Sequence, residues 1–283
     1  MVVALNITTE QPLYALFMNK LGHIPYYFPT DFNTWRESLL RDTDYDGEPL
    51  FKKMKTLLLL EGDDITGFIQ LAVTHFVLAP DGTKSKEFSY GLIRNLYFLP
   101  NCQNGHMLLD CAADYFKHYG IAKPYAFFHY FGMSCYARQG KLHEDACHVE
   151  KLLEHYGYVK EHENVYFSRL LTDDFDDDRE IAFEYSSDDE SISFRKEGGV
   201  LGGCKLYFIP SSTICFLRWI WIHPELTQKG YGSRCMKKLF FVLKQKGTSR
   251  LDTDTADSNF AAQGYYHKTG FADMGSMRSY CVY

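Results

Sequence analysis

The sequence predicts an α/β fold made of two similar units in tandem. The β-branched and aromatic segment Ile214–Ile222 runs into a loop with two glycines and then into an amphipathic pattern. The same order of strand, polar loop and helix begins at Leu92–Pro100. Each copy later contains a helix closed by glycine and an aromatic residue, Gly157-Tyr158 and Gly270-Phe271. This repetition indicates internal duplication of one α/β unit.

The elements of the first copy follow from periodicity and end signals. Apolar residues at helical spacing, among them Leu109, Ala112 and Phe116, predict a helix with one buried face, and Asp31 is expected to cap another. The expected helices are Pro12–Leu21, Asp31–Arg41, His106–Tyr119 and Val149–Tyr156, and the expected strands are Met54–Leu60, Ile65–Leu78, Phe88–Leu99, Tyr125–His129 and Val165–Leu170.

In the second copy, Pro224 ends the strand because it has no N–H to donate. The helix after the loop has its apolar residues Met236, Leu239, Phe240 and Leu243 on one face, and Gly247 is placed to end it. Leu251–Thr255 alternates in polarity and predicts a short strand. Asp257 or Ser258 is expected to cap the last helix, which ends at Gly270.

An aspartate-rich segment, Asp173–Glu190, separates the copies. We expect a first domain at 1–172, an acidic linker at 173–180 and a second domain at 181–283. A solvated linker is the favoured interpretation of the acidic residues. The alternative is an acidic rim that attracts a cationic acceptor.

The loop with Gly230 and Gly232 is a candidate anion site. Glycines let the backbone approach a ligand, and the unpaired N–H groups of the following helix point at it. A tight turn that binds nothing is one alternative. A dinucleotide fold is another, with Asp252 about 20 residues downstream, but Cys235 stands where that fingerprint has its third glycine. A pyrophosphate site for coenzyme A is the third.

A second motif favours coenzyme A. The pattern Asn259-x-x-Ala262-x-x-x-Tyr266-x-x-x-Gly270-Phe271, after a Pro-then-Gly-x-Gly loop, resembles the GNAT superfamily of acyl-CoA-dependent N-acetyltransferases. The resemblance implies two tandem GNAT-like domains, each with a mixed, mostly antiparallel central sheet flanked by helices. It covers the second copy strongly and the first copy only in the order of its elements.

The resemblance also implies roles for individual residues. Strand residues Ile220, Trp221 and Ile222 would pair with the pantetheine arm, and Asn259 would hydrogen-bond it. Tyr266 would be the catalytic acid that protonates the departing CoA thiolate. The pyrophosphate would lie on the backbone N–H groups of Gln228, Lys229, Gly230, Tyr231, Gly232 and Ser233. The first position of the loop departs from the family pattern, because it is Thr227 instead of Gln or Arg.

The first copy lacks these groups and is interpreted as degenerate. Met107 replaces the second loop glycine, Ala146 stands in the place of Asn259, and Leu153 stands in the place of Tyr266. A leucine can donate no proton, and a methionine blocks close approach of the backbone.

The predicted function is direct transfer of acetyl from acetyl-CoA, the co-substrate, to a primary amine of a small molecule or peptide. The general base is left unassigned, with His223, Glu225, Asp252 and Asp254 nearby in sequence. Two other functions stay open, a non-catalytic CoA-sensing or scaffold module and a transferase that uses aminoacyl-tRNA.

Composition narrows the remaining choices. The net charge of −6 over 283 residues argues against nucleic acid as the main partner. No apolar run is long enough to span a bilayer, and Met1–Gln11 does not read as a signal peptide. The eight scattered cysteines lack metal-ligand spacing, so we expect no metal and reduced thiols in the cytoplasm. We expect a monomer or homodimer.

Overall fold

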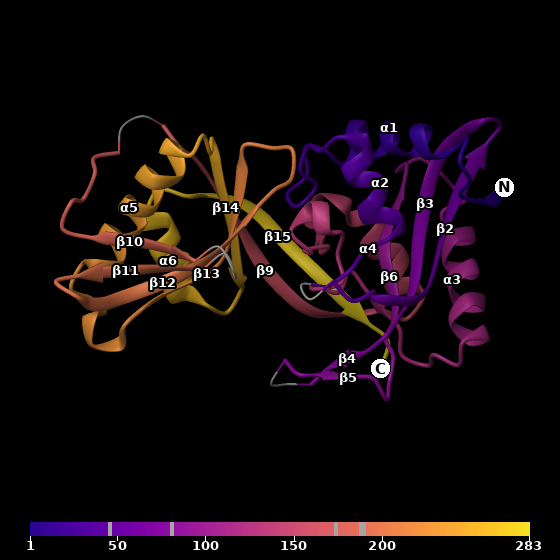
Figure 1. The fold of residues 1–283 in the computed structure, drawn as a ribbon. Helices are drawn as coiled ribbons and strands as arrows, with labels where there is room; N and C mark the ends of the chain where they lie inside the picture. Colours follow the sequence, from indigo (N-terminus) through magenta and orange to yellow (C-terminus); the bar gives the residue numbers. More distant parts are fainter. Residues whose placement is uncertain (45–46, 80–81, 173–174, 187–190) are drawn as a thin grey trace. The chain divides into compact units, whose positions relative to one another are not determined.

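A computed structural model describes residues 1–44, 47–79, 82–172, 175–186 and 191–283 of the chain. The chain forms two compact units, Met1–Glu163 with Met277–Tyr283, and Asn164–Ser276. The C-terminal residues therefore complete the first unit, and the chain enters the second unit at Asn164. These boundaries differ from the ranges 1–172, 173–180 and 181–283 expected above. Figure 1 shows the elements of both units.

The first unit is a mixed sheet covered by helices on both faces. Its sheet has the order β1-β2-β3-β6-β7-β15, and β8 also pairs with β15. Strands β6 and β7 are parallel, whereas the pairs β1–β2, β2–β3, β3–β6, β7–β15 and β8–β15 are antiparallel. Phe68 of β3 stacks on Phe17 of α1 at 4.5 Å, whereas Ile69 joins the core beneath α3 and α4. The elements are β1 (Val2–Ala4), α1 (Glu10–Lys20), α2 (Phe32–Leu40), β2 (Phe51–Glu61), β3 (Asp64–Thr74), β4 (Val77–Leu78), β5 (Lys84–Ser85), β6 (Gly91–Phe98), α3 (His106–His118), β7 (Tyr125–Ala126), β8 (Leu142–His143), α4 (Cys147–His155) and β15 (Ala272–Cys281).

The second unit repeats the plan in part. Its strands follow the order β9-β14-β13-β12-β11-β10, with β13 and β14 parallel and the others antiparallel. Helices α5 and α6 share one core with this sheet, around Leu217, Leu239 and Tyr266. The elements are β9 (Val159–Leu170), β10 (Ala182–Ser186), β11 (Ser191–Lys196), β12 (Gly199–Phe208), β13 (Ile214–Ile222), α5 (Tyr231–Gln245), β14 (Arg250–Ala256) and α6 (Phe260–Lys268).

Most predicted elements are confirmed, and the differences include a strand end, a helix cap and a missed strand. The strand expected at Tyr125–His129 is only Tyr125–Ala126. The cap of α6 is Asn259, whose side chain accepts from the N–H of Ala262, and not Asp257 or Ser258. Strand β12 was not predicted, because its three glycines hide the alternating pattern.

The described part of the acidic segment contacts α5, although Asp176, Asp177 and Glu180 remain exposed to solvent. The ring of Phe175 lies 5.0 Å from that of Phe240. Asp178 accepts two hydrogen bonds from Arg234, at 2.7 and 2.9 Å, and Asp177 pairs with Lys238. The pKa of Asp178 is lowered, first by the hydrogen bond from Arg234. Residues 173–174 and 187–190 of this segment lie outside the described residues.

Helices α3 and α5 have the same pattern of buried residues, and this pattern shows which residues of the two copies correspond. Gly120 and Gly247 both follow their helix with positive φ, at 68° and 85°. Counting back from them, the buried Leu108, Leu109, Ala112 and Phe116 match the buried Cys235, Met236, Leu239 and Leu243. Gly105 therefore corresponds to Gly232, so Met107 is not the replacement of the second loop glycine. In the part of the chain that the structure describes, no helix is long and apolar enough to cross a membrane.

Candidate functional site

The site begins where two parallel strands separate. Strands β13 and β14 pair from Ile214 and Arg250 as far as Leu217 and Thr253, and the pairing ends there (Figure 1). At the same point the register of β13 with β12 shifts, which leaves Arg218 without an opposite residue. Such a bulge re-aims side chains and backbone groups beside a site. We call the opening beyond Leu217 and Thr253 the fork.

A cavity of about 390 Å³ opens beyond the fork on the side of α5 and α6. Six of the predicted site residues line it: Ile220, Trp221, Ile222, Gln228, Gly232 and Tyr266. Four lining residues were not predicted to belong to the site: Thr227, Ala261, Ala262 and Tyr265. For Ala261 and Ala262 the sequence did contain a signal, because two adjacent alanines at the start of a helix leave room for a ligand.

The other five predicted residues do not line this cavity. Lys229, Gly230 and Tyr231 continue the loop into α5. Ser233 lines a different cavity, together with Lys237 and Phe240. Asn259 acts as the cap of α6, so its side-chain oxygen is already an acceptor for the helix.

The edge of β13 offers backbone groups to the cavity. The N–H of His223 donates to the carbonyl of Leu201 on β12, at 2.8 Å. Since backbone groups alternate in direction along a strand, the N–H and C=O groups of Ile222 and Ile220 point to the other side, into the fork. An amide-containing ligand can therefore add to β13 as an extra strand.

The loop and the start of α5 supply further donors. Gln228 and Gly230 adopt positive φ, 61° and 83°, and Gly230 is the residue that begins α5. The N–H groups of the first helical turn have no intrahelical acceptor and carry the positive end of the helix dipole. Arg234 on that turn is paired with Asp178 and Glu180, whereas Lys229 in the loop is exposed. This geometry suits a phosphate group.

Tyr266 lies at the fork with only 5% of its surface exposed. Its hydroxyl is 3.5 Å from Oγ1 of Thr253, and that hydroxyl donates to the carbonyl of Leu217 at 2.8 Å. Burial raises the pKa of Tyr266, so the phenol stays protonated at neutral pH and keeps a proton to give. The neighbouring Tyr265 donates to the carbonyl of Gly232 at 2.8 Å and thereby ties α6 to the start of α5.

Carboxylates lie on the opposite face of β14. Thr253 points toward Tyr266, so Asp252 and Asp254 point to the other face. Asp252 is fully buried and accepts from Tyr166, Ser168 and Arg250, which gives it a structural role. Asp254 is the first residue of β14 beyond the fork and accepts from Nδ2 of Asn164 at 2.5 Å.

In the first unit the equivalent opening is filled. Nε2 of His148 on α4 lies 2.8 Å from the carbonyl oxygen of Phe98, the residue that corresponds to Ile222. The two rings meet edge to face at 4.9 Å. Burial lowers the pKa of His148, so the neutral ring donates its Nε2 proton to that carbonyl. Gly105 also faces Phe98, because a Cβ there would lie 2.8 Å from ring carbons.

Comparison with known proteins agrees with this geometry. Residues 156–271 match the sequence model of the acetyltransferase (GNAT) family. A tandem GNAT protein from the clavulanic acid biosynthesis pathway has a TM-score of 0.67 at 10% identity, over 100% of this chain and 98% of that one. The chain is a tandem GNAT-fold protein.

Two other solved structures have a similar fold over nearly the whole of this chain. A GCN5-related N-acetyltransferase from Sphaerobacter thermophilus has a TM-score of 0.65 at 9% identity, over 99% of this chain and 94% of that one. The glucosamine N-acetyltransferase region of a fungal multi-domain GH3 beta-N-acetylglucosaminidase has a TM-score of 0.67 at 13% identity. That match covers 99% of this chain and only 38% of the fungal chain. A sequence search of curated proteins gives no match.

Proposed function

We propose that the second unit binds acetyl-CoA and transfers its acetyl group directly to a primary amine. The observation that carries this proposal is the fork between β13 and β14, which opens into a cavity beside the buried hydroxyl of Tyr266. The extended pantetheine arm would add to the edge of β13 at Ile220 and Ile222. The pyrophosphate would lie on the N–H groups at the start of α5, next to Lys229.

The reaction must deliver a proton to the departing sulfur and remove a proton from the attacking amine nitrogen. The amine nitrogen attacks the thioester carbonyl carbon, the C–S bond breaks, and the sulfur leaves as a thiolate. Tyr266 is the proposed donor to that thiolate, because its phenol is neutral and near the fork. Backbone N–H groups at the Arg218 bulge are the proposed donors to the carbonyl oxygen as it gains charge.

Asp254 is the proposed group that receives the proton of the attacking amine. It occupies the position on β14 that Arg218 occupies on β13, immediately beyond the last pair. Its charge reaches the site, since it contributes to raising the pKa of Tyr266. A carboxylate here also attracts a cationic amine before the proton is removed, directly or through one water.

The proposal is tested by binding and turnover of the full chain. Calorimetry should show one acetyl-CoA site per chain, and a panel of amino acids, polyamines, aminoglycosides and peptides should include an acceptor that releases CoA thiol. Two equal sites per chain would contradict a filled first unit. Binding without turnover on every amine class would instead support a CoA-sensing module.

The proposal also covers the compartment and the groups that the reaction uses. We propose that the chain works in the cytoplasm, where the thiols of its eight cysteines stay reduced. Among the described residues, no group of three or more His, Cys, Asp or Glu side chains is placed to hold a metal ion. The proposed steps use only side-chain and backbone groups of this chain.

A further inference from the structure

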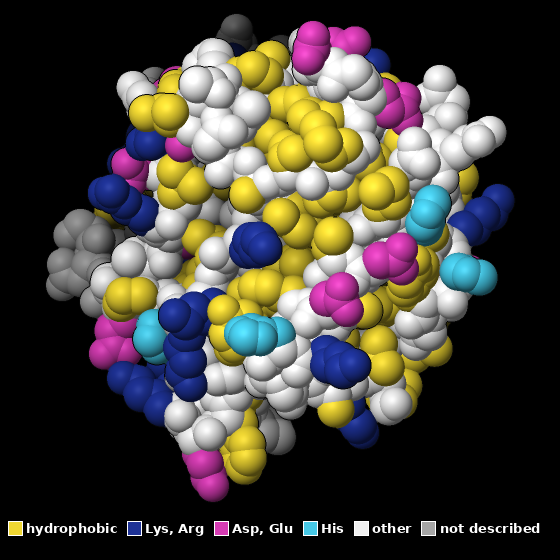
Figure 2. Space-filling model, turned by 90° about the vertical axis from the view of Figure 1, so that its right-hand side faces the viewer, with side chains coloured by type: hydrophobic (Ala, Val, Ile, Leu, Met, Phe, Trp, Pro, Cys, Tyr) yellow, Lys and Arg dark blue, Asp and Glu magenta, His cyan; other side chains and the backbone are white. Residues whose placement is uncertain are grey.

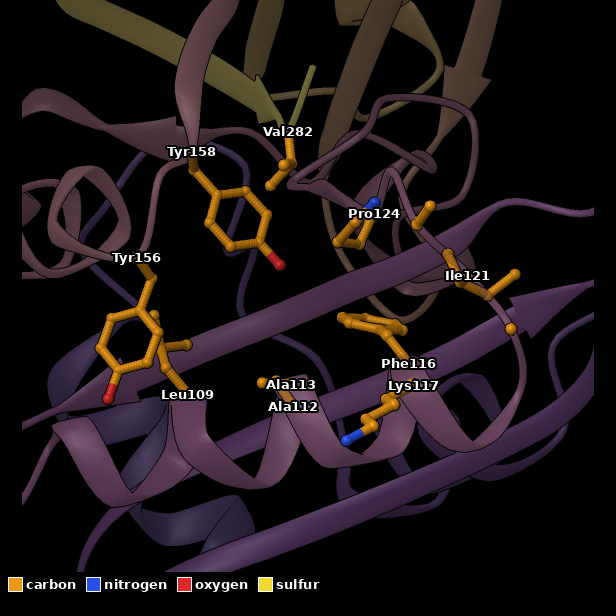
Figure 3. Close-up of a pocket in the computed structure, with 12 residues that line it drawn as sticks. Leu109, Ala112, Ala113, Phe116, Lys117, Ile121, Pro124, Tyr156, Tyr158 and Val282 are labelled. Carbon is orange, nitrogen blue, oxygen red and sulfur yellow. The ribbon is translucent and has the colours of Figure 1, made fainter.

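The first unit contains an open cavity of its own, away from the filled fork. Its volume is about 470 Å³, within the range of small-molecule sites. Figure 3 shows how α3 forms its floor, while the segments before β7, after α4 and at the C-terminus form its walls. Most lining side chains are apolar, among them Leu109, Ala113, Phe116, Pro124 and Val282. Figure 2 shows hydrophobic side chains gathered on the side of the molecule that carries α3.

The second unit has aromatic rings of its own at the corresponding position. In the alignment of the copies, Ala113 corresponds to Phe240 and Tyr158 to Phe271. Phe240 is 1% exposed, and the ring of Phe175 lies 5.0 Å from it at a tilt of 45°. These two rings take up part of the space in the second unit, and a cavity of about 330 Å³ remains beside them. In the first unit, alanine in place of phenylalanine leaves the corresponding space open.

One buried polar group points into the open cavity. Tyr158 is 6% exposed, and Figure 3 shows its hydroxyl directed between Phe116 and Pro124. This hydroxyl has no hydrogen-bond partner among the described residues, whereas that of Tyr156 donates to Asp110 at 2.6 Å. Burial raises the pKa of Tyr158, so it remains a donor. A hydroxyl that faces a cavity and has no protein partner is available to an acceptor atom of a ligand.

The charge at the cavity indicates the sign of the ligand. Lys117 on α3 is the one charged residue that lines it, and no ion pair of Lys117 is found within the described ranges. We propose that this cavity binds a small aromatic carboxylic acid, with its ring over Ala113 and its oxygen atoms at Tyr158 and Lys117. The ring of the ligand would take the place that Phe240 takes in the second unit.

The test is a binding titration of the full chain with 3-phenylpropionate, followed by ligand-observed NMR with saturating acetyl-CoA present. We expect a Kd of about 1 mM or tighter, and at least tenfold weaker binding of the neutral 3-phenylpropanamide. Displacement of the acid by acetyl-CoA would place it in the other cavity and overturn the proposal. Equal binding of the acid and the amide would also overturn it.

Two substitutions copy residues of the second unit and serve as matched variants. Ala113→Phe should abolish binding by filling the space, and Tyr158→Phe should weaken it about 2- to 10-fold, the worth of one hydrogen bond. Lys117→Gln should lower the affinity for 3-phenylpropionate to that of the wild-type chain for 3-phenylpropanamide. Intact folding is checked by the emission of Trp35 in the first unit and by unchanged acetyl-CoA binding. Wild-type affinity in both Ala113→Phe and Lys117→Gln would refute the site.

Discussion

The difference between the two forks can be transferred from one copy to the other. His148 fills the first fork by donating to the carbonyl of Phe98, and the residue at its position on α6 is Ala261, which lines the open cavity. Ala261→His should therefore place an imidazole against the carbonyl of Ile222. The proposed pantetheine arm would lose both that backbone acceptor and part of its space.

The magnitude follows from the groups displaced. One hydrogen bond contributes about 1 kcal/mol, and each buried CH₂ contributes about 0.8 kcal/mol. Displacing one hydrogen bond and two such groups costs roughly 2.5 kcal/mol, which weakens acetyl-CoA binding between 10- and 100-fold. Ala261 is itself exposed in the free structure, so the fold should tolerate the change.

Calorimetry with acetyl-CoA measures the effect, and the reciprocal variant His148→Ala is the control. Removing His148 frees the carbonyl of Phe98, yet the first unit should still not bind acetyl-CoA, because the ring of Phe98 remains against Gly105. Unchanged affinity of Ala261→His would refute the assignment of the cavity to the pantetheine arm. If the wild-type chain binds a second acetyl-CoA and the Phe98→Ala variant does not, the first fork is open and the reasoning is wrong.

Three further substitutions test the chemistry and the loop. Tyr266→Phe should lower kcat by roughly 10²–10⁴ with acetyl-CoA affinity unchanged, provided that single-turnover rates follow the chemical step; an unaltered rate excludes Tyr266 as the acid. Gly230→Val should abolish acetyl-CoA binding in calorimetry, whereas Gly247→Val, with the same backbone strain at the far end of α5, should only lower the melting temperature. Asp254→Asn should reduce kcat by at least roughly tenfold at neutral pH, and equal rates across the pH range would remove Asp254 as the base.

The sequence predicted the site best where local pattern decides structure. The strand through Ile220 and Ile222, the loop with Gly232 and the helix with Tyr266 are each local features, and all three line the cavity. Asn259 was placed at the right point of the chain, yet its side chain caps α6. Local pattern cannot separate a cap from a ligand contact, because both use the same amide at the start of a helix.

What the sequence could not predict depends on pairing between distant segments. The sequence could not show that His148 fills the first fork, because its partner Phe98 lies 50 positions away and on a strand. The bulges at Arg94 and Arg218 likewise appear only when each strand is set against its neighbour. Strand β15 carries few apolar residues at alternating positions, so only its pairing with β7 and β8 reveals it.

The C-terminal residues follow the second unit in the sequence but belong to the first unit, and this gives a prediction about folding. Residues 277–283 belong to the first unit, where Arg278 bonds Glu150 and Glu163, and Tyr280 donates to Glu150 at 2.8 Å. Ending the chain at Ser276 removes the strand that pairs with β7 and β8.

We expect this truncation to destabilise the first unit by several kcal/mol, since a fully buried Met277, a nearly buried Tyr280 and a group of charge-assisted hydrogen bonds are lost together. The second unit should still bind acetyl-CoA. Trp35 is fully buried in the first unit, whereas Trp219 and Trp221 are 44% and 45% exposed in the second, so a red shift of emission reports the first unit alone. The double substitution Arg278→Met with Tyr280→Phe should produce a smaller shift in the same direction. If the truncated chain keeps wild-type emission and unfolds in urea at the same midpoint, the last strand does not support the first unit.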